Sequence, residues 1–219
     1  MGIVILAKAP VAGRVKTRLE LPAARTLALH RAMAEDVRSA CIAAGVRPLW
    51  AVAGGLDHPW VDELRARGDQ VIAQAEGDLG ARIEAGLIAA GPGPSLALGM
   101  DSPTLPPSAL RAALETGADV VLGPAFDGGY WLIGWREVWL GLLDGVRWSA
   151  ETTLAETAAA AREAGLSVEL VEFWYDVDTP ADLAFLRNHL RVLPADRAAA
   201  TRAAIEDGIE DGTHFPAPG

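Results

Sequence analysis

One acidic residue, Asp101, follows a short apolar run at a position where a sheet would place chemistry. Residues 95–99 have the pattern of a buried strand, and Ser102 and Pro103 follow Asp101 directly. In open α/β sheets, ligands bind outside the carboxyl ends of the strands. Mg²⁺ is usually held by one or two carboxylates with substrate phosphates and water, so Asp101 is a candidate metal ligand and catalytic residue. Asp before Ser-Pro is also ordinary turn chemistry, and this stretch alone leaves both interpretations open.

Two more carboxylates, Asp176 and Asp178, stand two residues apart in an extended segment before a helix start. That spacing projects both side chains to the same side of the chain. Like charges placed there repel each other unless a cation or a basic group lies between them. Helix capping explains the neighbouring Thr179 and Pro180 but neither of the two carboxylates. Asp176 and Asp178 are therefore candidate metal ligands together with Asp101.

The first loop is basic in a chain that is otherwise acidic. Lys8 and Lys16 are the only lysines among 19 basic residues, and both lie in this loop. Ammonium groups just after a first strand are typical of phosphate-binding loops, whereas a solvated basic turn is the structural alternative. The candidate nucleotide-binding residues of the loop are Lys8, Gly13, Arg14, Lys16 and Arg18.

A second glycine-containing stretch, residues 74–87, leads into a predicted helix for which Asp78 is a natural N-cap. The amino terminus of a helix, approached through glycines, can contact a phosphate or a base closely. This stretch adds three candidate nucleotide-binding residues, which are Gln74, Gly80 and Arg82. Capping explains Asp78 without any ligand.

The turn Asp127-Gly128-Gly129 lies between two apolar runs and indicates a β-hairpin. Paired glycines also allow a substrate to approach the backbone. We expect Gly128, Gly129 and Tyr130 to bind an acceptor molecule. Asp127 is then a candidate catalytic residue that orients or deprotonates an attacking hydroxyl group. The hairpin and the acceptor site are compatible interpretations.

The elements that must position these residues alternate between apolar strands and amphipathic helices. Continuous apolar runs suit strands that are buried on both faces. The fold class is therefore α/β, with a mostly parallel central sheet flanked by helices and an antiparallel element near residues 128–135. Strands are expected at 2–7, 48–53, 70–74, 95–99, 118–123 and 167–173, and helices at 22–44, 60–67, 106–116, 151–165 and 180–193.

Composition limits the class of protein and its partners. With 219 residues, 51% of them hydrophobic, the chain can bury a core, and we expect one domain over residues 1–193. Residues 194–219 read as an alanine-rich segment and an acidic tail containing Gly and Pro. A net charge of −10 argues against nucleic acid or an anionic membrane as partner. The first apolar run is too short for a signal peptide, so a cytoplasmic protein with a small-molecule partner is expected.

Six ordered motifs resemble one known family. They are AKAPVAGRVKTRL, GDLGARI, GMDSPTLP, GPAFDGGYWLIG, RWSAETT and DVDTPADL. They look like the bacterial transferases called selenodomain-associated transferase 1 or arsenosugar-biosynthesis glycosyltransferase-like proteins, which are placed among GT-A-fold enzymes beside small nucleotidyltransferases. The resemblance implies a nucleotide-diphospho-sugar transferase fold, a nucleoside diphosphate or triphosphate substrate, and Mg²⁺ or Mn²⁺. It also implies that Asp101 binds the metal and that Lys16 and Arg18 bind phosphate.

Two transferase reactions fit these residues. The family resemblance favours a glycosyltransferase that acts from a nucleotide-sugar on a small acceptor, although Ser102 and Pro103 replace the second half of the usual Asp-x-Asp. The alternative is a nucleotidyltransferase that moves a nucleoside monophosphate from a triphosphate to a phosphorylated small molecule. A lone Asp with a basic loop suits that second reaction, which depends mostly on positioning and charge neutralisation. A non-catalytic nucleotide-binding module is a third interpretation.

Overall fold

The computed structural model describes residues 1–210, with side chains as far as residue 207. The chain groups into two compact units, and each is built from segments that are far apart in the sequence. The first unit comprises Met1–Ala9, Ala40–Gly99 and Pro106–Tyr175. The second comprises Pro10–Ser39, Met100–Leu105 and the chain from Asp176 onward. One domain over residues 1–193 stays a prediction.

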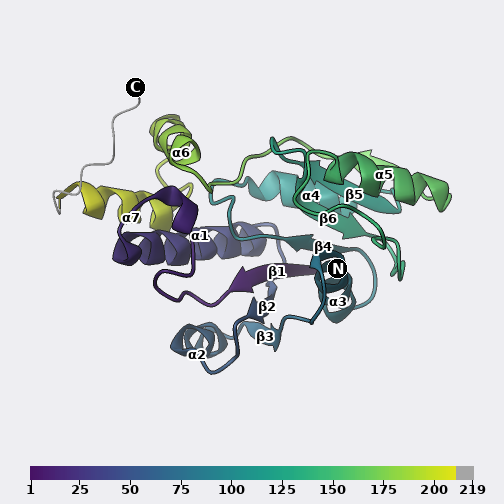
Figure 1. Ribbon diagram of the computed structural model, residues 1–219, viewed down its shortest axis with the longest axis horizontal. Helices are drawn as coiled ribbons and strands as arrows, with labels where there is room; N and C mark the ends of the chain where they lie inside the picture. Colours follow the sequence, from purple (N-terminus) through teal and green to yellow (C-terminus); the bar gives the residue numbers. More distant parts are fainter. Residues whose placement is uncertain (211–219) are drawn as a thin grey trace. The chain divides into compact units, whose positions relative to one another are not determined.

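The first unit contains a seven-stranded sheet with the order β3-β2-β1-β4-β6-β5-β7, most of which can be followed in Figure 1. β6 runs antiparallel to its neighbours β4 and β5, and every other pairing is parallel. The predicted α/β class, with a mostly parallel sheet and an antiparallel element, is confirmed. The strands are β1 (Gly2–Lys8), β2 (Leu49–Ala53), β3 (Gln70–Ala73), β4 (Ser95–Leu98), β5 (Val120–Pro124), β6 (Tyr130–Trp135) and β7 (Val168–Leu170).

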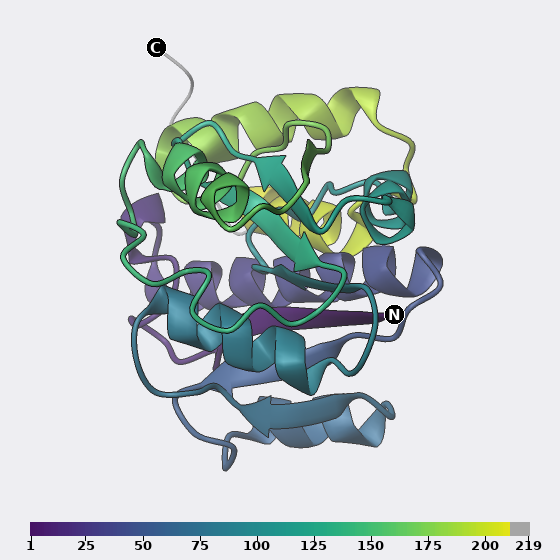
Figure 2. The same cartoon turned by 90° about the vertical axis from the view of Figure 1, so that its right-hand side faces the viewer.

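Helices cover this sheet because its apolar side chains alternate between two faces. In β1, Ile3 and Ile5 point to one face and Val4 to the other, and all three are almost fully buried. Val4 belongs to a core cluster with Ile83 and Leu87 of α3 (Leu79–Ala89) and with Ala158 and Ala161 of α5 (Thr153–Glu163), so these two helices share a face. Figure 2 shows α3 lying across β1. The other helices of this unit are α2 (Pro59–Ala66) and α4 (Pro107–Glu115).

The strand order explains why two particular loops matter. The chain proceeds from β1 to β2 and β3 on one side, whereas β4 pairs with β1 on the other side. Such a reversal is the usual ligand site of a doubly wound sheet. The segments that leave the carboxyl ends of β1 and β4 are those that carry Lys16 and Asp101, respectively.

The second unit is helical. It contains the short helix η1 (Thr17–Leu19), most of α1 (Ala23–Ala43), α6 (Pro180–Val192) and α7 (Ala199–Glu210). Asp36 of α1 is buried, and its two carboxylate oxygens accept hydrogen bonds from the backbone N–H groups of Ala200 (3.1 Å) and Thr201 (2.7 Å). These bonds satisfy donors in the first turn of α7, which the helix itself leaves unpaired. Asp36 therefore fixes α7 to α1.

α7 differs from the expectation for the end of the chain. The sequence predicts an alanine-rich segment and an acidic tail over residues 194–219, whereas α7 forms at Ala199–Glu210, where Asp36 caps its first turn and Ile205 is buried. The part of the predicted tail from residue 211 to residue 219 lies outside the described residues. β7 is also shorter than the predicted strand 167–173.

In the part of the chain that the structure describes, no helix is long and apolar enough to cross a membrane.

Replacing Asp36 by Ala should destabilise the protein by about 1–3 kcal/mol, because a buried and a partly buried N–H group lose their acceptor. Asp36→Asn should cost less, since its amide oxygen still accepts one of the two bonds. Asp207→Ala, at an exposed acidic residue of the same helix α7, is the matched control and should be near neutral. Urea unfolding of the three variants measures this; equal losses for Asp36→Ala and Asp207→Ala would contradict the capping role.

Candidate active site

The ammonium group of Lys16 lies at the centre of a charged cluster in the second unit. Its Nζ is 2.5 Å from Oδ1 of Asp101 and 2.9 Å from Oδ1 of Asp178, and it donates to the backbone oxygen of Val177 at 2.7 Å. The Lys16 side chain is only 5% exposed, whereas those of Asp101 and Asp178 are 38% and 44% exposed. One buried cation thus joins two carboxylates that remain open to solvent.

The charges of the cluster keep Lys16 protonated. Burial by itself lowers the pKa of this ammonium, but the negative charges of Asp101 and Asp178 outweigh burial, so the pKa lies above its ordinary value. Lys16 lies between Asp101 and Asp178, a pair that is distant in sequence. A cation or basic group between the neighbouring Asp176 and Asp178 stays a prediction.

The local backbone holds both partners of Lys16 in place. The N–H of Val177 donates to the backbone oxygen of Asp101 at 2.9 Å, which ties the two acidic segments together. At the start of α6, Oδ2 of Asp182 accepts hydrogen bonds from the N–H groups of Asp178 (3.0 Å) and Thr179 (2.7 Å). The Thr179 hydroxyl in turn accepts from the N–H of Asp182, which completes the predicted capping box.

Asp176 has a different environment from Asp178. The hydroxyl of the buried Ser102 donates to Oδ1 of Asp176 at 2.5 Å. Burial raises the pKa of Asp176 to about 6; the hydrogen bond from Ser102 opposes this rise, and the charges of Asp101 and Asp178 add to it. Sequence reasoning missed Ser102 as a partner, because turn chemistry already explained a Ser before Pro.

The donor set fits a hard divalent cation in part. Within the described residues there is no group of three or more His, Cys, Asp or Glu side chains placed to hold a metal ion, so the predicted trio of Asp101, Asp176 and Asp178 is not assembled as one metal site. Asp101 and Asp178 do converge, and two carboxylates suffice for Mg²⁺ when a substrate supplies phosphate oxygens.

The rest of the basic loop is exposed. The Arg18 guanidinium lies 3.9 Å from Oδ2 of Asp178, and its side chain is largely open to solvent. Gly13 has a left-handed backbone with φ 75°, next to the exposed Arg14. Lys8 is the last residue of β1, is also exposed, and belongs to the first unit. Lys16 is thus the buried member of a loop whose other basic side chains face solvent.

The other predicted nucleotide-binding residues lie in the first unit, where local contacts account for each of them. Gly80 is buried, and a Cβ there would come within 2.9 Å of the Trp148 ring, so packing requires a glycine. Arg82 donates from Nε to the backbone oxygen of Gly77 at 3.0 Å. Gln74 donates to the backbone oxygen of Ala51 at 3.5 Å.

The Asp127 turn joins β5 to β6, also in the first unit. Oδ1 of Asp127 accepts the N–H of Gly129 at 2.9 Å, which is ordinary turn capping. Gly128 has φ 85°, and a Cβ there would lie 2.2 Å from the backbone oxygen of Glu151. Tyr130 is mostly buried, and burial raises the pKa of its hydroxyl well above the ordinary value, so the hydroxyl stays neutral. The hairpin interpretation is confirmed, and Asp127 itself remains exposed.

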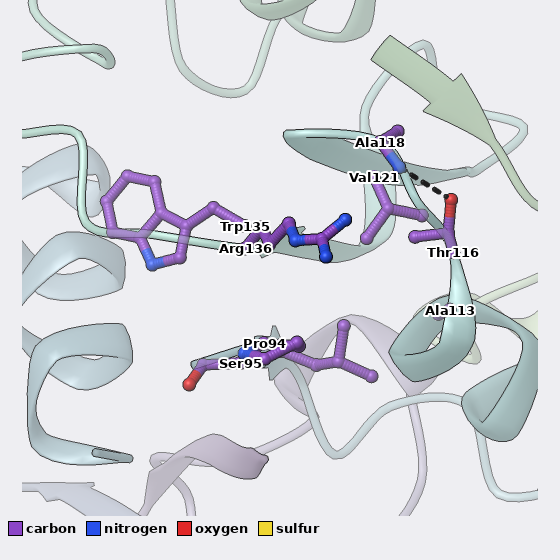
Figure 3. A pocket seen from close by; sticks show the side chains of 9 residues that line it. Pro94, Ser95, Ala113, Thr116, Ala118, Val121, Trp135 and Arg136 are labelled. Carbon is purple, nitrogen blue, oxygen red and sulfur yellow. Dashed lines mark hydrogen bonds between the residues drawn. The ribbon is translucent and has the colours of Figure 1, made fainter. Parts of the chain in front are cut away.

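Some hollows lie apart from these predicted residues. One, a narrow crevice in the first unit, is drawn in Figure 3, where the Ala118 N–H donates to the Thr116 hydroxyl at its edge. It contains none of the predicted site residues. Another, in the second unit, lies between residues 19–21 and the first two turns of α6. Its lining is Leu19, Glu20, Leu21, Pro180, Leu183, Ala184 and Arg187.

Comparison with protein families gives one match. The model of the family described as "Uncharacterized protein conserved in bacteria" (DUF2064) matches residues 36–150, which is more than half of the chain. The chain belongs to the DUF2064 family. The matched region includes Asp101 and Asp127, whereas Lys16 and Asp178 lie outside it. No curated protein matches the chain.

Solved structures place this DUF2064 protein in a known fold. A crystal structure from Desulfovibrio desulfuricans G20, of a protein provisionally described as a nucleotide-diphospho-sugar transferase, is 29% identical, covers 96% of each chain and has a TM-score of 0.82. The inositol-1-phosphate CTP transferase from T. maritima is 15% identical over 94% of this chain and 97% of its own, with a TM-score of 0.56. A nucleotidyl transferase from Methanothermobacter thermautotroptrophicus is 21% identical over 88% of this chain and 99% of its own, with a TM-score of 0.57. The predicted nucleotide-diphospho-sugar transferase fold is confirmed.

Replacing Lys16 by Met should lower the free energy of unfolding by about 1–3 kcal/mol, because Asp101 and Asp178 then face each other without a cation. This range lies between the values for exposed and for buried ion pairs, since the lysine is buried but its partners are half exposed. Arg191→Met removes the same charge from an exposed position on α6 and serves as the control. Chemical unfolding at neutral pH should separate the two variants; identical curves would mean that the cluster adds no stability.

Replacing Gly128 by Ala should cost at least about 1 kcal/mol, because a left-handed backbone and the Glu151 oxygen both exclude a Cβ. Gly129→Ala is the matched control, since its Cβ would meet only the Asp127 carboxylate, at 3.1 Å. Thermal melting compares the two. If Gly128→Ala melted like Gly129→Ala, the glycine would not be needed for packing.

Proposed function

We propose that this protein is a transferase that takes its donor as a nucleotide, with a nucleotide-sugar as the preferred donor and a small molecule as acceptor. The observation that carries the proposal is the convergence of the half-exposed Asp101 and Asp178 on Lys16. The segments that bear Lys16 and Asp101 follow the carboxyl ends of adjacent parallel strands. The 29% identity to a protein named for nucleotide-diphospho-sugars supports the choice of donor. The finer family name and a cytoplasmic location belong to the same proposal.

In this proposal, Asp101 and Asp178 hold Mg²⁺ or Mn²⁺, and Asp176 supports them from its bond to Ser102. Bound there, the ion would neutralise charge on the diphosphate leaving group and act as a Lewis acid. The exposed guanidinium groups of Arg14 and Arg18 bind phosphate oxygens, because Arg forms charge-assisted hydrogen bonds with phosphate. Lys16 contacts both carboxylates and orients them.

The remaining predicted residues keep proposed roles on the donor. Lys8 and Gly13 belong to the phosphate loop, and Gln74, Gly80 and Arg82 belong to the nucleotide side. Gly80 and Arg82 are engaged in local contacts, so their proposed role is to set the path of the backbone on the nucleotide side.

On the acceptor side, Asp127 is proposed as the general base, with Gly128, Gly129 and Tyr130 shaping the acceptor site. Only Oδ1 of Asp127 is occupied by the turn bond to Gly129, and the side chain is exposed. A carboxylate in that position can accept a proton from a hydroxyl within hydrogen-bonding reach.

Nucleotidyl transfer is the second candidate, and one specific observation favours it. The second carboxylate of an Asp-x-Asp would stand two residues after Asp101, where this chain has Pro103, so the segment offers one metal-binding carboxylate. A single carboxylate with a basic loop also suits a triphosphate donor. The two reactions differ in their leaving group: a nucleoside diphosphate leaves in glycosyl transfer and pyrophosphate leaves in nucleotidyl transfer.

Thermal shift with nucleotide-sugars and nucleoside triphosphates, each with Mn²⁺, should identify the donor. A ligand at 100 times its Kd stabilises the folded protein by about 2.7 kcal/mol. The product that then accumulates with acceptor mixtures, a nucleoside diphosphate or pyrophosphate, decides between the two reactions. No stabilisation by any nucleotide, with or without metal, would contradict the proposal.

Two substitutions should separate donor binding from catalysis. Asp101→Asn should weaken Mn²⁺-dependent donor binding, whereas Asp127→Asn should leave donor affinity intact and lower kcat by about 10²–10⁴-fold, as expected for loss of a general base. Asp207→Asn, at an exposed position on α7, is the control and should change neither value. Full turnover in Asp127→Asn would reduce Asp127 to a turn residue.

A further inference from the structure

We infer that Lys16 makes the carboxylates Asp101 and Asp178 a poor site for a free divalent cation, so that the metal enters only together with nucleotide phosphates. The inference rests on the proposed function and adds to it a rule for how the site assembles. It concerns the charge that this chain itself places between its two candidate metal ligands.

The first argument is the saturation of the Lys16 ammonium. An ammonium group has three N–H donors. Three acceptors surround Nζ of Lys16, which are Oδ1 of Asp101, Oδ1 of Asp178 and the backbone oxygen of Val177. All its donors are matched inside the cluster. Lys16 is therefore a fixed component of the carboxylate pair.

The second argument is charge. Asp101 and Asp178 carry two negative charges, and Lys16 cancels one of them at hydrogen-bonding distance. The Arg18 guanidinium, 3.9 Å from the other oxygen of Asp178, offsets part of the second. Asp176 interacts with both carboxylates and adds negative charge near the pair. A divalent cation that approaches Asp101 and Asp178 is nevertheless repelled by an ammonium that holds the same oxygen atoms.

The third argument is burial. The Lys16 side chain is almost completely buried, so solvent and salt screen its charge less than they screen an exposed lysine. The left-handed backbone of Lys16, with φ 49°, is unusual for a residue other than glycine and shows that the surrounding structure fixes its position. The positive charge is thus a fixed part of the site. Unlike the charge of an exposed lysine, it cannot move away by a change of side-chain rotamer.

Nucleotide phosphates would change this balance. A diphosphate brings several negative charges and oxygen ligands of the kind that Mg²⁺ prefers, and Mg²⁺ is normally bound by one or two carboxylates plus substrate phosphates. With phosphates present, Lys16 and Arg18 become favourable neighbours for the added charge. Metal and phosphate binding are then coupled, and each strengthens the other by the same factor.

Titration with Mn²⁺ alone tests this directly, with isothermal calorimetry on the full chain. Lys16→Met and Lys16→Gln remove the charge, and Lys16→Gln keeps an N–H donor for Val177, which favours folding. Both should bind Mn²⁺ alone more tightly than the wild-type protein by roughly tenfold, a factor within the range typical of coupled sites. Lys16→Arg, which keeps the charge, and Arg191→Met, which removes an exposed one from α6, should bind as weakly as the wild type.

A second experiment needs no variant and uses pyrophosphate as the phosphate probe. Water-proton relaxation should detect Mn²⁺ bound to the wild-type protein in the presence of pyrophosphate and little without it. A tight Mn²⁺ site in the wild-type protein without phosphate would overturn the inference. Unchanged Mn²⁺ affinity in both folded neutral variants would overturn it as well.

These results are separable from the proposed function. Tighter Mn²⁺ binding by the neutral variants, in a protein that no nucleotide stabilises, would support the role of Lys16 and refute nucleotide transfer. Nucleotide binding together with unchanged Mn²⁺ affinity in the neutral variants would support nucleotide transfer and refute the role of Lys16.

Discussion

The buried ammonium of Lys16 is the interaction on which the second unit depends. It contacts Asp101 and Asp178, so it joins the loop after β1, the segment after β4 and the segment before α6. Lys16 and Asp178, in the first and last of these segments, are 162 residues apart. A backbone hydrogen bond between Val177 and Asp101 supports the same junction. A polar contact of this kind fixes geometry more sharply than apolar packing, because each acceptor must lie in a hydrogen-bonding direction.

Much of the fold could be predicted from local pattern. The apolar runs of β1 and β4 are long enough to indicate strands buried on both faces, and the signature around Thr179 and Asp182 indicates the capping box at the start of α6. The end of the chain could not be predicted in this way. α7 depends on Asp36, more than 160 residues earlier, and no local pattern announces so distant a cap.

The candidate site shows the same division. Asp101, Asp178 and Lys16 stand out in the sequence by residue type and by position. Asp101 and Lys16 follow apolar strands, and Lys16 is one of only two lysines in the chain. Which of them pair is a tertiary fact: the sequence suggested a metal between carboxylates and phosphate on Lys16, and the structure places Lys16 on the carboxylates. Gly80 and Gly128 have a packing requirement that the sequence did not show, since close approach to Trp148 and Glu151 requires a glycine at both positions.

One carboxylate at the beginning of α6 has two duties. Oδ2 of Asp182 accepts hydrogen bonds from the N–H and the hydroxyl of Thr179, and also from the N–H of Asp178. The atom that begins the helix therefore also sets the position from which Asp178 reaches Lys16. Among natural variants of this chain, residue 182 should consequently change only together with the residues of the charged cluster. A substitution at the start of α6 would also alter the position of Asp178, although Asp182 itself contacts no substrate.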